Sequence, residues 1–369
     1  MSRIVVIAPD KFKGSLTAME AAQAIERGVL AADPNARCRL CPMADGGEGT
    51  VDVFVERGYQ RRTVTVRGPL GEPVDAGFAL KDDAAVLEMS AASGLRLLRR
   101  ERYDPLRTDT YGTGQLIAAA LDAGAKHLIV GIGGSATNDA GTGMLRALGV
   151  RFFDAEGNAI DGPMPAYASL ARIDVGGLDS RLAKKTIEVA SDVDNPLCGP
   201  DGAAHTFAAQ KGADERTIDR LDDLLAHIAD VAAQSLGRDC RNSPGAGAAG
   251  GLGFALLAFL NATMARGVEL VAREGGLEDM LHGADLCMTG EGKIDMQTLH
   301  GKTVAGVAAL AAKHGVAVIA FGGLVEPDAA AALQKRGVLT VQIAPADMPA
   351  EAAMQQAGTL LERTAEAAL

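Results

Sequence analysis

The sequence lacks any long uninterrupted apolar run. Of its 369 residues, 48% are hydrophobic, yet no run reaches the roughly 18 apolar residues that a membrane-spanning helix needs. Residues 1–3 lead directly into an apolar segment at 4–7, which leaves no room for a signal peptide. We therefore expect a cytoplasmic protein that has no membrane partner.

The sequence also has little basic charge and few cysteines. Its 36 Lys and Arg residues are outnumbered by 47 Asp and Glu, and the net charge of -11 argues against nucleic acid or anionic lipid as a main partner. Five cysteines without an export signal predict reduced thiols. Cys38 and Cys41 have no second pair beside them, which favours buried thiols over a metal or redox site. The remaining classes are enzymes and small-molecule-binding proteins.

The ends of the chain show the pattern of a parallel α/β sheet. Residues 4–7 form an apolar run typical of a buried strand, and Thr17 and Glu20 fit a capping box at the start of a helix. A strand at 37–43 and a helix ending near 57 follow. The last third of the chain shows the same alternation of strands and helices, with predicted strands at 285–290, 316–321 and 339–343 and a predicted helix at 303–313.

The middle of the chain has a different pattern. From Tyr59 onward, residues 61–66 and 76–80 alternate polar and apolar side chains, which predicts antiparallel strands. A Thr/Gly loop at 108–114 precedes a predicted helix at 115–123. We therefore predict two α/β domains with mostly parallel sheets: a discontinuous domain of residues 1–60 plus 265–369, and an inserted domain of residues 61–264.

A glycine-rich segment at 131–143 follows an apolar run and precedes a helical pattern. Such a turn offers backbone N–H groups and a helix N-terminus to an anion. Residues 131–136 fit the dinucleotide fingerprint in its final-alanine form, and Asp154 stands near the place of the ribose-binding acid. An NAD(P)-dependent oxidoreductase is therefore one interpretation, although it leaves Asn138 and Asp139 without a role.

Phosphoryl transfer accounts for more of the loops. It needs backbone N–H groups or lysines around phosphates, carboxylates for Mg²⁺, and an acid or base near the acceptor hydroxyl. Asp10 lies at the end of the first predicted strand, and several later strands also lead into acidic or lysine-bearing loops. The same acids also serve helix caps, turns or solvated loops in other proteins, so both interpretations stay open. The loop residues in question are Lys11, Lys13, Asp45, Glu48, Asp192, Asp194, Glu291, Lys293 and Asp295.

Taken together, the loops resemble the type I glycerate kinase family. The matching segments occur in the family's order and span the chain from residue 4 to residue 323. One departure lies at residues 207–212, where the Gly-Pro expected before Gln210 is missing, so the backbone there is not predicted. The matching segments are residues 8–16, 43–50, 110–114, 131–143, 192–197, 244–253 and 289–295.

The resemblance implies two α/β domains with an active-site cleft between them. It also implies transfer of the γ-phosphate of ATP to D-glycerate with Mg²⁺ as cofactor, giving 2-phosphoglycerate as the expected product of a bacterial member. Whether C2 or C3 is phosphorylated stays open at this point, and a homo-oligomer is compatible with the sequence. A non-catalytic sensor of small hydroxy acids is a third interpretation, although no effector or DNA-binding module is visible.

Loop position and chemistry then suggest a role for each candidate residue. Asp192 is the expected base for the acceptor hydroxyl, and Lys11, Lys13 and Lys293 would offset the developing charge. The expected metal ligands are Asp45, Glu48, Asp194 and Asp295. The residues expected to bind substrate or phosphate are Ser15, Gly46, Gly47, Gly133, Gly134, Ser135, Asn138, Asp139, Gly247, Gly250, Gly251 and Glu291.

Overall fold

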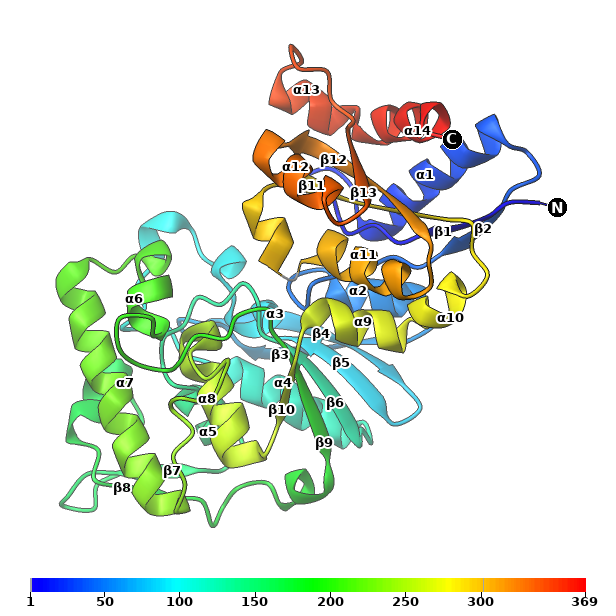
Figure 1. Ribbon diagram of the computed structural model, residues 1–369. Helices are drawn as coiled ribbons and strands as arrows, with labels where there is room; N and C mark the ends of the chain where they lie inside the picture. Colours follow the sequence, from blue (N-terminus) through cyan, green and yellow to red (C-terminus); the bar gives the residue numbers. More distant parts are fainter. Residues whose placement is uncertain (1, 301) are drawn as a thin grey trace. The chain divides into compact units, whose positions relative to one another are not determined.

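The computed structural model describes residues 2–300 and 302–369, without the side chain of His300. The chain forms two compact units (Figure 1): unit 1, Met1–Asp45 with Arg266–Leu369, and unit 2, Gly46–Ala265. The division differs from the predicted one in residues 46–60 and in Ala265, which fall in unit 2. These residues include helix α2 (Thr50–Glu56), which packs against strands β4 (Pro73–Lys81) and β5 (Ala84–Glu88) of that unit.

Unit 1 is built on a five-stranded sheet in the order β13-β12-β11-β1-β2, with every neighbouring pair parallel. Helices α1 and α14 lie on one side of this sheet, and α9 and α11 lie on the other (Figure 1). Covering both faces explains why the first strand is apolar throughout. The bounds are β1 Ile4–Ile7, α1 Ala18–Ala32, β2 Arg37–Leu40, α9 Gly267–Glu274, β11 Leu286–Ile294, α11 Thr303–Lys313, β12 Ala317–Val325, β13 Val338–Gln342 and α14 Ala357–Ala367.

Helix α1 begins as the capping-box pattern predicts. Glu20 N donates to Thr17 Oγ1 at 3.2 Å, and Thr17 N donates to Glu20 Oε2 at 2.8 Å. Its apolar face, including Ile25 and Val29, is fully buried in the core that it shares with α14. The first helix of the chain was therefore readable from local sequence, both in its start and in the face that it buries.

Unit 2 is built on a six-stranded sheet in the order β10-β9-β6-β5-β4-β3. The first four strands are parallel, and β5-β4-β3 are antiparallel. The alternating pattern predicted the antiparallel strands β3 and β4. A separate antiparallel pair is formed by β7 and β8. The bounds are β3 Gln60–Arg67, β4 Pro73–Lys81, β5 Ala84–Glu88, α4 Tyr111–Asp122, β6 His127–Gly131, α5 Thr142–Ala147, β7 Arg151–Phe153, β8 Arg172–Asp174, β9 Thr186–Ala190, α7 Glu215–Leu236, α8 Ala248–Leu260 and β10 Thr263–Ala265.

The predicted fold class, α/β with mostly parallel sheets, is confirmed, but two local predictions were wrong. Strand β11 does not end at Gly290; it continues to Ile294 and pairs with β12 as far as Val325. Helix α4 begins at Tyr111, so the Thr/Gly segment predicted as a loop forms its first turn. In both places, long-range packing overrides the local preference of glycine for loops.

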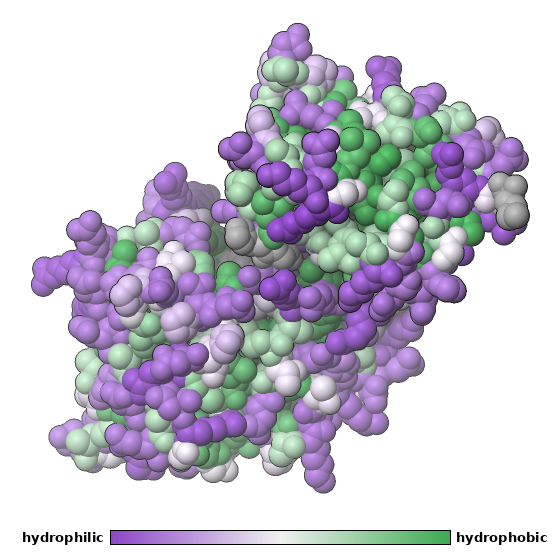
Figure 2. All heavy atoms as spheres, in the orientation of Figure 1, coloured by the Kyte–Doolittle hydropathy of each residue, from purple (hydrophilic) through white to green (hydrophobic). Residues whose placement is uncertain are grey.

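The exposed surface is mixed in character. In the view of Figure 2, polar side chains cover most of unit 2, while apolar side chains gather over part of unit 1. Large apolar side chains exposed in unit 1 include Leu324, Leu339 and Met354. Within the described part of the chain, no helix combines the length and apolar character needed to cross a membrane.

Candidate active site

The sheet of unit 1 has a topological switch point between β1 and β11. The chain moves from β1 to β2 on one side and from β11 to β12 on the other. In open α/β sheets, ligands bind beside the carboxyl ends of the strands at such a point. Asp10 follows β1 there, and its N–H donates to the carbonyl of Gly290 on β11 at 2.8 Å. The candidate site of unit 1 is therefore built around these two strands.

Asp10 is a buried carboxylate beside a second acid. Its oxygens accept hydrogen bonds from Lys11 N, at 2.7 Å, and from the Thr303 hydroxyl at the start of α11. Burial and the negative charge of Asp45 nevertheless raise the pKa of Asp10 to about 7. Two hydrogen bonds therefore do not compensate for the loss of water and the neighbouring negative charge.

Glu291 lies on the stretch of β11 that the sequence had placed in a loop. Thr298 donates its hydroxyl to Glu291 Oε1 at 2.7 Å, and burial raises the pKa of Glu291 to about 7. Lys302 opposes this shift, whereas Asp10 and Asp295 add to it. We use the name carboxylate cluster of unit 1 for Asp10 together with Asp45 and Glu291, each of which interacts electrostatically with Asp10. Its two buried acids titrate near neutral pH, as expected of groups that bind a cation or exchange a proton.

The predicted lysines of unit 1 lie around this edge of the sheet. Lys293 Nζ forms ion pairs with Glu326 at 2.7 Å and with Asp295 at 3.5 Å. Because Lys293 is about half exposed, the pairs are screened by water and contribute little to stability. Lys11 is half buried and Lys13 is exposed in the loop after β1, where the Ser15 hydroxyl donates to the Phe12 carbonyl at 3.0 Å. The structure thus groups Lys293 with Asp295, and it gives the hydroxyl of Ser15 a backbone partner.

In unit 2, the glycine-rich segment at 131–143 packs against a second glycine-rich segment, residues 244–253. A Cβ on Gly250 would lie 2.0 Å from the carbonyl oxygen of Thr137, and the φ of Gly250 is +69°. Gly251 packs in the same way against Ala140, and Gly247 packs against Pro196. Gly247, Gly250 and Gly251 are all buried, so close approach of two backbones accounts for these glycines.

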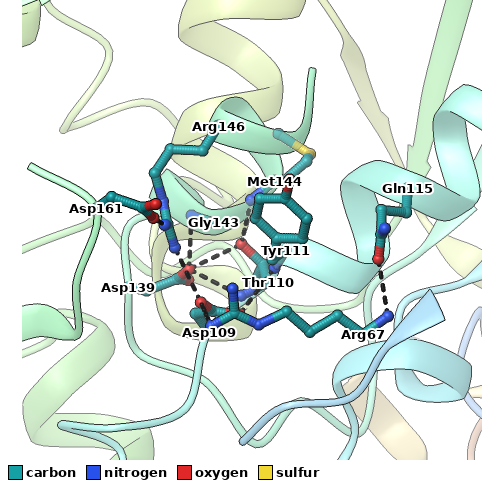
Figure 3. A network of polar contacts seen from close by, with 10 residues as sticks. All are labelled: Arg67, Asp109, Thr110, Tyr111, Gln115, Asp139, Gly143, Met144, Arg146 and Asp161. Carbon is teal, nitrogen blue, oxygen red and sulfur yellow. Dashed lines mark hydrogen bonds and ion pairs between the residues drawn. The ribbon is translucent and has the colours of Figure 1, made fainter. Parts of the chain in front are cut away.

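Asp139 connects the N-termini of two helices (Figure 3). Its carboxylate accepts hydrogen bonds from Thr110 N at 2.9 Å and Thr110 Oγ1 at 2.8 Å, just before α4. It also accepts from Gly141 N at 3.2 Å and Gly143 N at 3.0 Å, at the start of α5. Burial and Asp109 raise the pKa of Asp139, while these donors oppose the shift. The N–H groups that could have held a ligand phosphate are therefore used by an internal carboxylate.

Two arginines surround the same region (Figure 3). Asp109 Oδ2 lies 2.9 Å from an Arg146 nitrogen and 3.2 Å from an Arg67 nitrogen. Both guanidinium groups stack on the ring of Tyr111, at 5.5 and 5.1 Å from its centroid. This network supports the junction between α4 and α5, and the cations in it are balanced by nearby carboxylates.

The structure contradicts the dinucleotide interpretation. A dinucleotide fold starts its helix within the fingerprint, whereas α5 begins at Thr142, six residues after Ala136. The helix N-terminus is also occupied by Asp139. Asp154 follows β7, which pairs with β8 and not with β6, so it does not lie where a ribose-binding acid would.

The other predicted residues of unit 2 lie in loops at the strand ends. Gly46 and Gly47 approach the loop after β6, where a Cβ on Gly131 would lie 2.3 Å from the carbonyl oxygen of Gly46. Glu48 is exposed and lies 3.3 Å from an Arg96 nitrogen. Asp192 is half buried and Asp194 is exposed, in the loop after β9. In the described ranges 2–300 and 302–369, no group of three or more His, Cys, Asp or Glu side chains could hold a metal ion.

Sequence reasoning missed Lys211, which is buried next to the glycine-rich segment. Its ammonium group donates to the Thr137 carbonyl at 2.7 Å and to Ser135 Oγ at 2.9 Å. Lys211 ends a short 3-10 turn (Ala209–Lys211) in the segment where the sequence departs from the family pattern. The only sequence signal for it was the glycine that follows, Gly212. This glycine has a φ of +100°, and a Cβ there would lie 2.5 Å from the Tyr103 carbonyl oxygen, so the turn that ends at Lys211 requires a glycine.

Comparison with known proteins identifies the class and then the family. Parallel α/β units with acidic and glycine-rich loops at the strand ends are typical of enzymes that act on small anionic molecules. Residues 5–369 match the model of the glycerate kinase family. The glycerate kinase of Bacillus subtilis (strain 168) is 50% identical over 364 residues, covering 98% of this chain and 95% of the relative.

Two further comparisons agree. The glycerate 2-kinase of Escherichia coli (strain K12) is 48% identical over 328 residues, covering 88% of this chain and 86% of the relative. A crystal structure described as that of a glycerate kinase 2 from Salmonella typhimurium LT2 matches with a TM-score of 0.87 and 43% identity, over 100% of this chain and 97% of the other. The chain belongs to the glycerate kinase family, as the motifs predicted. It is therefore an enzyme of the kinase class, which implies the use of ATP.

Proposed function

We propose that this enzyme transfers the γ-phosphoryl group of ATP to the C2 hydroxyl of D-glycerate, giving 2-phospho-D-glycerate and ADP. The observation that carries the proposal is the 48% identity to the E. coli protein named glycerate 2-kinase. The buried acids at the switch point of unit 1 support it, because phosphoryl transfer needs carboxylates beside the phosphates. The five free cysteines accord with a cytoplasmic location.

We also propose that Mg²⁺ binds at the carboxylate cluster, with Asp10 and Asp45 as its protein ligands. Mg²⁺ typically takes one or two protein carboxylates and completes its shell with water and substrate phosphates, so Asp10 and Asp45 are sufficient as protein ligands. The neighbouring Asp45 charge raises the pKa of Asp10, and a divalent cation would remove that repulsion. When bound, the ion would neutralise charge on the phosphates of ATP. Among the predicted metal ligands, Asp45 fits best.

The remaining roles follow from chemistry and position. Asp192 is proposed as the base that accepts the proton of the C2 hydroxyl, and the loop after β9 leaves it half buried. Lys11, Lys13 and Lys293 are proposed to offset charge on the transferring phosphoryl group. Asp139 is proposed as a structural residue, because four donors already occupy its carboxylate.

A coupled assay for ADP release tests the proposed function. We expect ADP release to require D-glycerate, ATP and Mg²⁺ together, and to stop on addition of EDTA. L-Glycerate and glycerol are the matched controls, since the first changes the stereochemistry and the second removes the carboxylate. Absence of D-glycerate-dependent ADP release would exclude the function.

A further inference from the structure

Lys211 is a buried cation that forms no ion pair in the described part of the chain. The residue is 2% exposed, and no carboxylate of the described residues lies within ion-pair distance of its ammonium group. Its two partners, the Thr137 carbonyl and the Ser135 hydroxyl, are both neutral. Burying a charge without an opposite charge is costly, so a protein retains such a group where a bound ligand supplies the opposite charge or where it holds a backbone segment in place.

The hydroxyl of Ser135 is oriented by this contact. An ammonium group can only donate, so Ser135 Oγ must accept from Lys211 and direct its own proton elsewhere. Within the described chain, no acceptor receives that proton. Ser135 is 7% exposed, and its neighbour Gly134 is exposed with a φ of +75°. The hydroxyl is thus fixed as a donor at the point where the buried segment meets the surface.

Further polar groups of the same segment lack protein partners. The side-chain oxygen and nitrogen of Asn138 and the hydroxyl of Thr137 are buried without a hydrogen bond in the part of the chain that the structure describes. Buried polar groups are normally paired, and unpaired ones call for a specific explanation. Among the described residues, a lysine without an ion pair, a serine hydroxyl whose proton has no acceptor and an unpartnered amide therefore occur together in residues 135–138 and Lys211.

We propose that Lys211 and Ser135 form an anion subsite, in which the Ser135 hydroxyl donates to an anionic oxygen of a bound substrate and Lys211 positions that hydroxyl and supplies the positive charge. The anionic oxygen belongs to a carboxylate or to a phosphate. With the proposed function, on which the choice of ligands rests, these are the carboxylate of D-glycerate and the phosphates of ATP. Lys211 is a positioning residue here, because it acts through Ser135.

The pH dependence separates this role from a structural one. Burial lowers the pKa of Lys211 to about 7, and Asp139 opposes the shift. The free enzyme therefore loses the Lys211 charge as the pH rises above about 7, while a bound anion holds the proton on the lysine. Affinity for the anion should then fall more steeply with rising pH in the wild type than in a variant without Lys211. If Lys211 only held the Thr137 backbone in place, its loss would not change the pH dependence of the affinity for one particular ligand.

The test is isothermal titration calorimetry with D-glycerate and with ATP, separately, between pH 6 and 9. The proteins compared are the wild type, Lys211→Met, Ser135→Ala, the double variant, and Lys184→Met, which removes an exposed lysine of the same unit. We expect Lys211→Met to weaken one of the two ligands by ~10- to 100-fold and the other by less than ~3-fold. Weaker binding of D-glycerate would show that the subsite holds a carboxylate, and weaker binding of ATP would show that it holds a phosphate. Ser135→Ala should weaken the same ligand, and the double variant should be little worse than either single one.

Specific results would overturn the subsite. One is that Lys211→Met leaves both affinities unchanged, or weakens both ligands equally while lowering the Tm. Another is that the effects of Lys211→Met and Ser135→Ala on affinity add up in the double variant. A third is that ligand affinity depends on pH in Lys211→Met as it does in the wild type. If Lys211→Met does not fold, Ser135→Ala alone decides by its effect on one ligand. If the wild type binds the anions, and Lys211→Met weakens only one of them, but no ADP is released, the proposed function is excluded and the subsite stands. If the wild type binds neither D-glycerate nor ATP, both proposals are excluded.

Discussion

The hydroxyl of Thr303 donates a hydrogen bond to the carboxylate of Asp10, although 293 residues separate the two in the chain. Thr303 is the first residue of α11, and Asp10 lies in the loop after β1. The bond therefore connects the beginning and the last third of the sequence at the switch point of the unit 1 sheet. It lowers the pKa of Asp10 against the larger, opposite effects of burial and Asp45.

The first prediction is that Asp10→Asn raises stability near pH 8. The pKa of Asp10 is about 7 in the fold and 3.8 without it, so the wild type loses stability as the pH rises from about 4 to 7 and then levels off. An asparagine has no charge to desolvate and should avoid this loss, which is on the order of a few kcal/mol. Thermal denaturation in EDTA across pH 5–8.5 measures it.

A control variant and an activity measurement accompany this prediction. The exposed Asp347→Asn, also in unit 1, should show no such pH-dependent difference from the wild type. Asp10→Asn should also lose activity despite its higher Tm, since it removes a proposed Mg²⁺ ligand. A variant less stable than the wild type at pH 8 would contradict the destabilising role of the carboxylate.

The second prediction concerns Asp139. Asp139→Ala leaves four donors at the starts of α4 and α5 without their acceptor, which should lower the free energy of unfolding by ~2–4 kcal/mol. Asp139→Asn keeps an oxygen acceptor and should cost less. Asp223→Asn, an exposed acid on α7, should change the free energy of unfolding by less than ~0.5 kcal/mol. Chemical denaturation followed by circular dichroism gives these values, and a fully stable Asp139→Ala would exclude the structural role.

The third prediction compares two glycines in unit 2 that both have positive φ. Gly250→Ala places a Cβ 2.0 Å from the Thr137 carbonyl oxygen, so the 131–143 segment and α8 must move apart, and we expect a large loss of Tm or insoluble protein. Gly124→Ala has nothing within 4 Å of its Cβ and should cost only the backbone strain, about 1 kcal/mol. Equal effects of the two variants would show that close approach is not what requires Gly250.

The fourth prediction separates chemistry from binding. If Asp192 is the base for the acceptor hydroxyl, Asp192→Asn should lower kcat by about 10²- to 10⁴-fold. The Kd of ATP should stay within about two-fold, since the proposed role concerns the acceptor. Steady-state kinetics and calorimetry supply the two numbers, and near-normal turnover would remove Asp192 from the mechanism.

Local sequence was sufficient where local interactions decide the structure. The capping box of Thr17 and Glu20, the apolar first strand and the alternating strands β3 and β4 could be read directly from the chain. Each depends on residues close in sequence or on a period of two or 3.6. The resemblance of the loops to a known family was likewise visible, because it depends on short motifs in a fixed order.

Local sequence failed where distant segments decide. Gly290 and Gly292 suggested a loop, yet β12 supplies hydrogen bonds that extend β11 through them. Gly112 and Gly114 suggested a loop, but they lie inside α4, where a Cβ would be 1.9 Å from the Arg67 carbonyl and 2.5 Å from that of Met144. In each case, the absence of a side chain lets the glycine lie close to a backbone segment that is distant in the sequence, and the local sequence does not indicate that segment.

The same limit applies to the candidate site. The predicted ligand-binding role of Asp139 stays a prediction, and only the structure shows that Thr110, Gly141 and Gly143 donate hydrogen bonds to its carboxylate. Lys211 drew no attention because a single lysine is usually solvated. Its burial next to Ser135 depends on a contact between residues 76 positions apart.

The most direct test of the central claim is proton-coupled ³¹P NMR of the product formed from D-glycerate, ATP and Mg²⁺. A phosphate on C2 is next to one proton, so its resonance should be a doublet, and it should grow as the γ-phosphate signal of ATP disappears. A triplet would place the phosphate on the CH₂ group of C3. A triplet, or an unchanged ATP spectrum with active protein and Mg²⁺ present, would contradict the proposed glycerate 2-kinase activity.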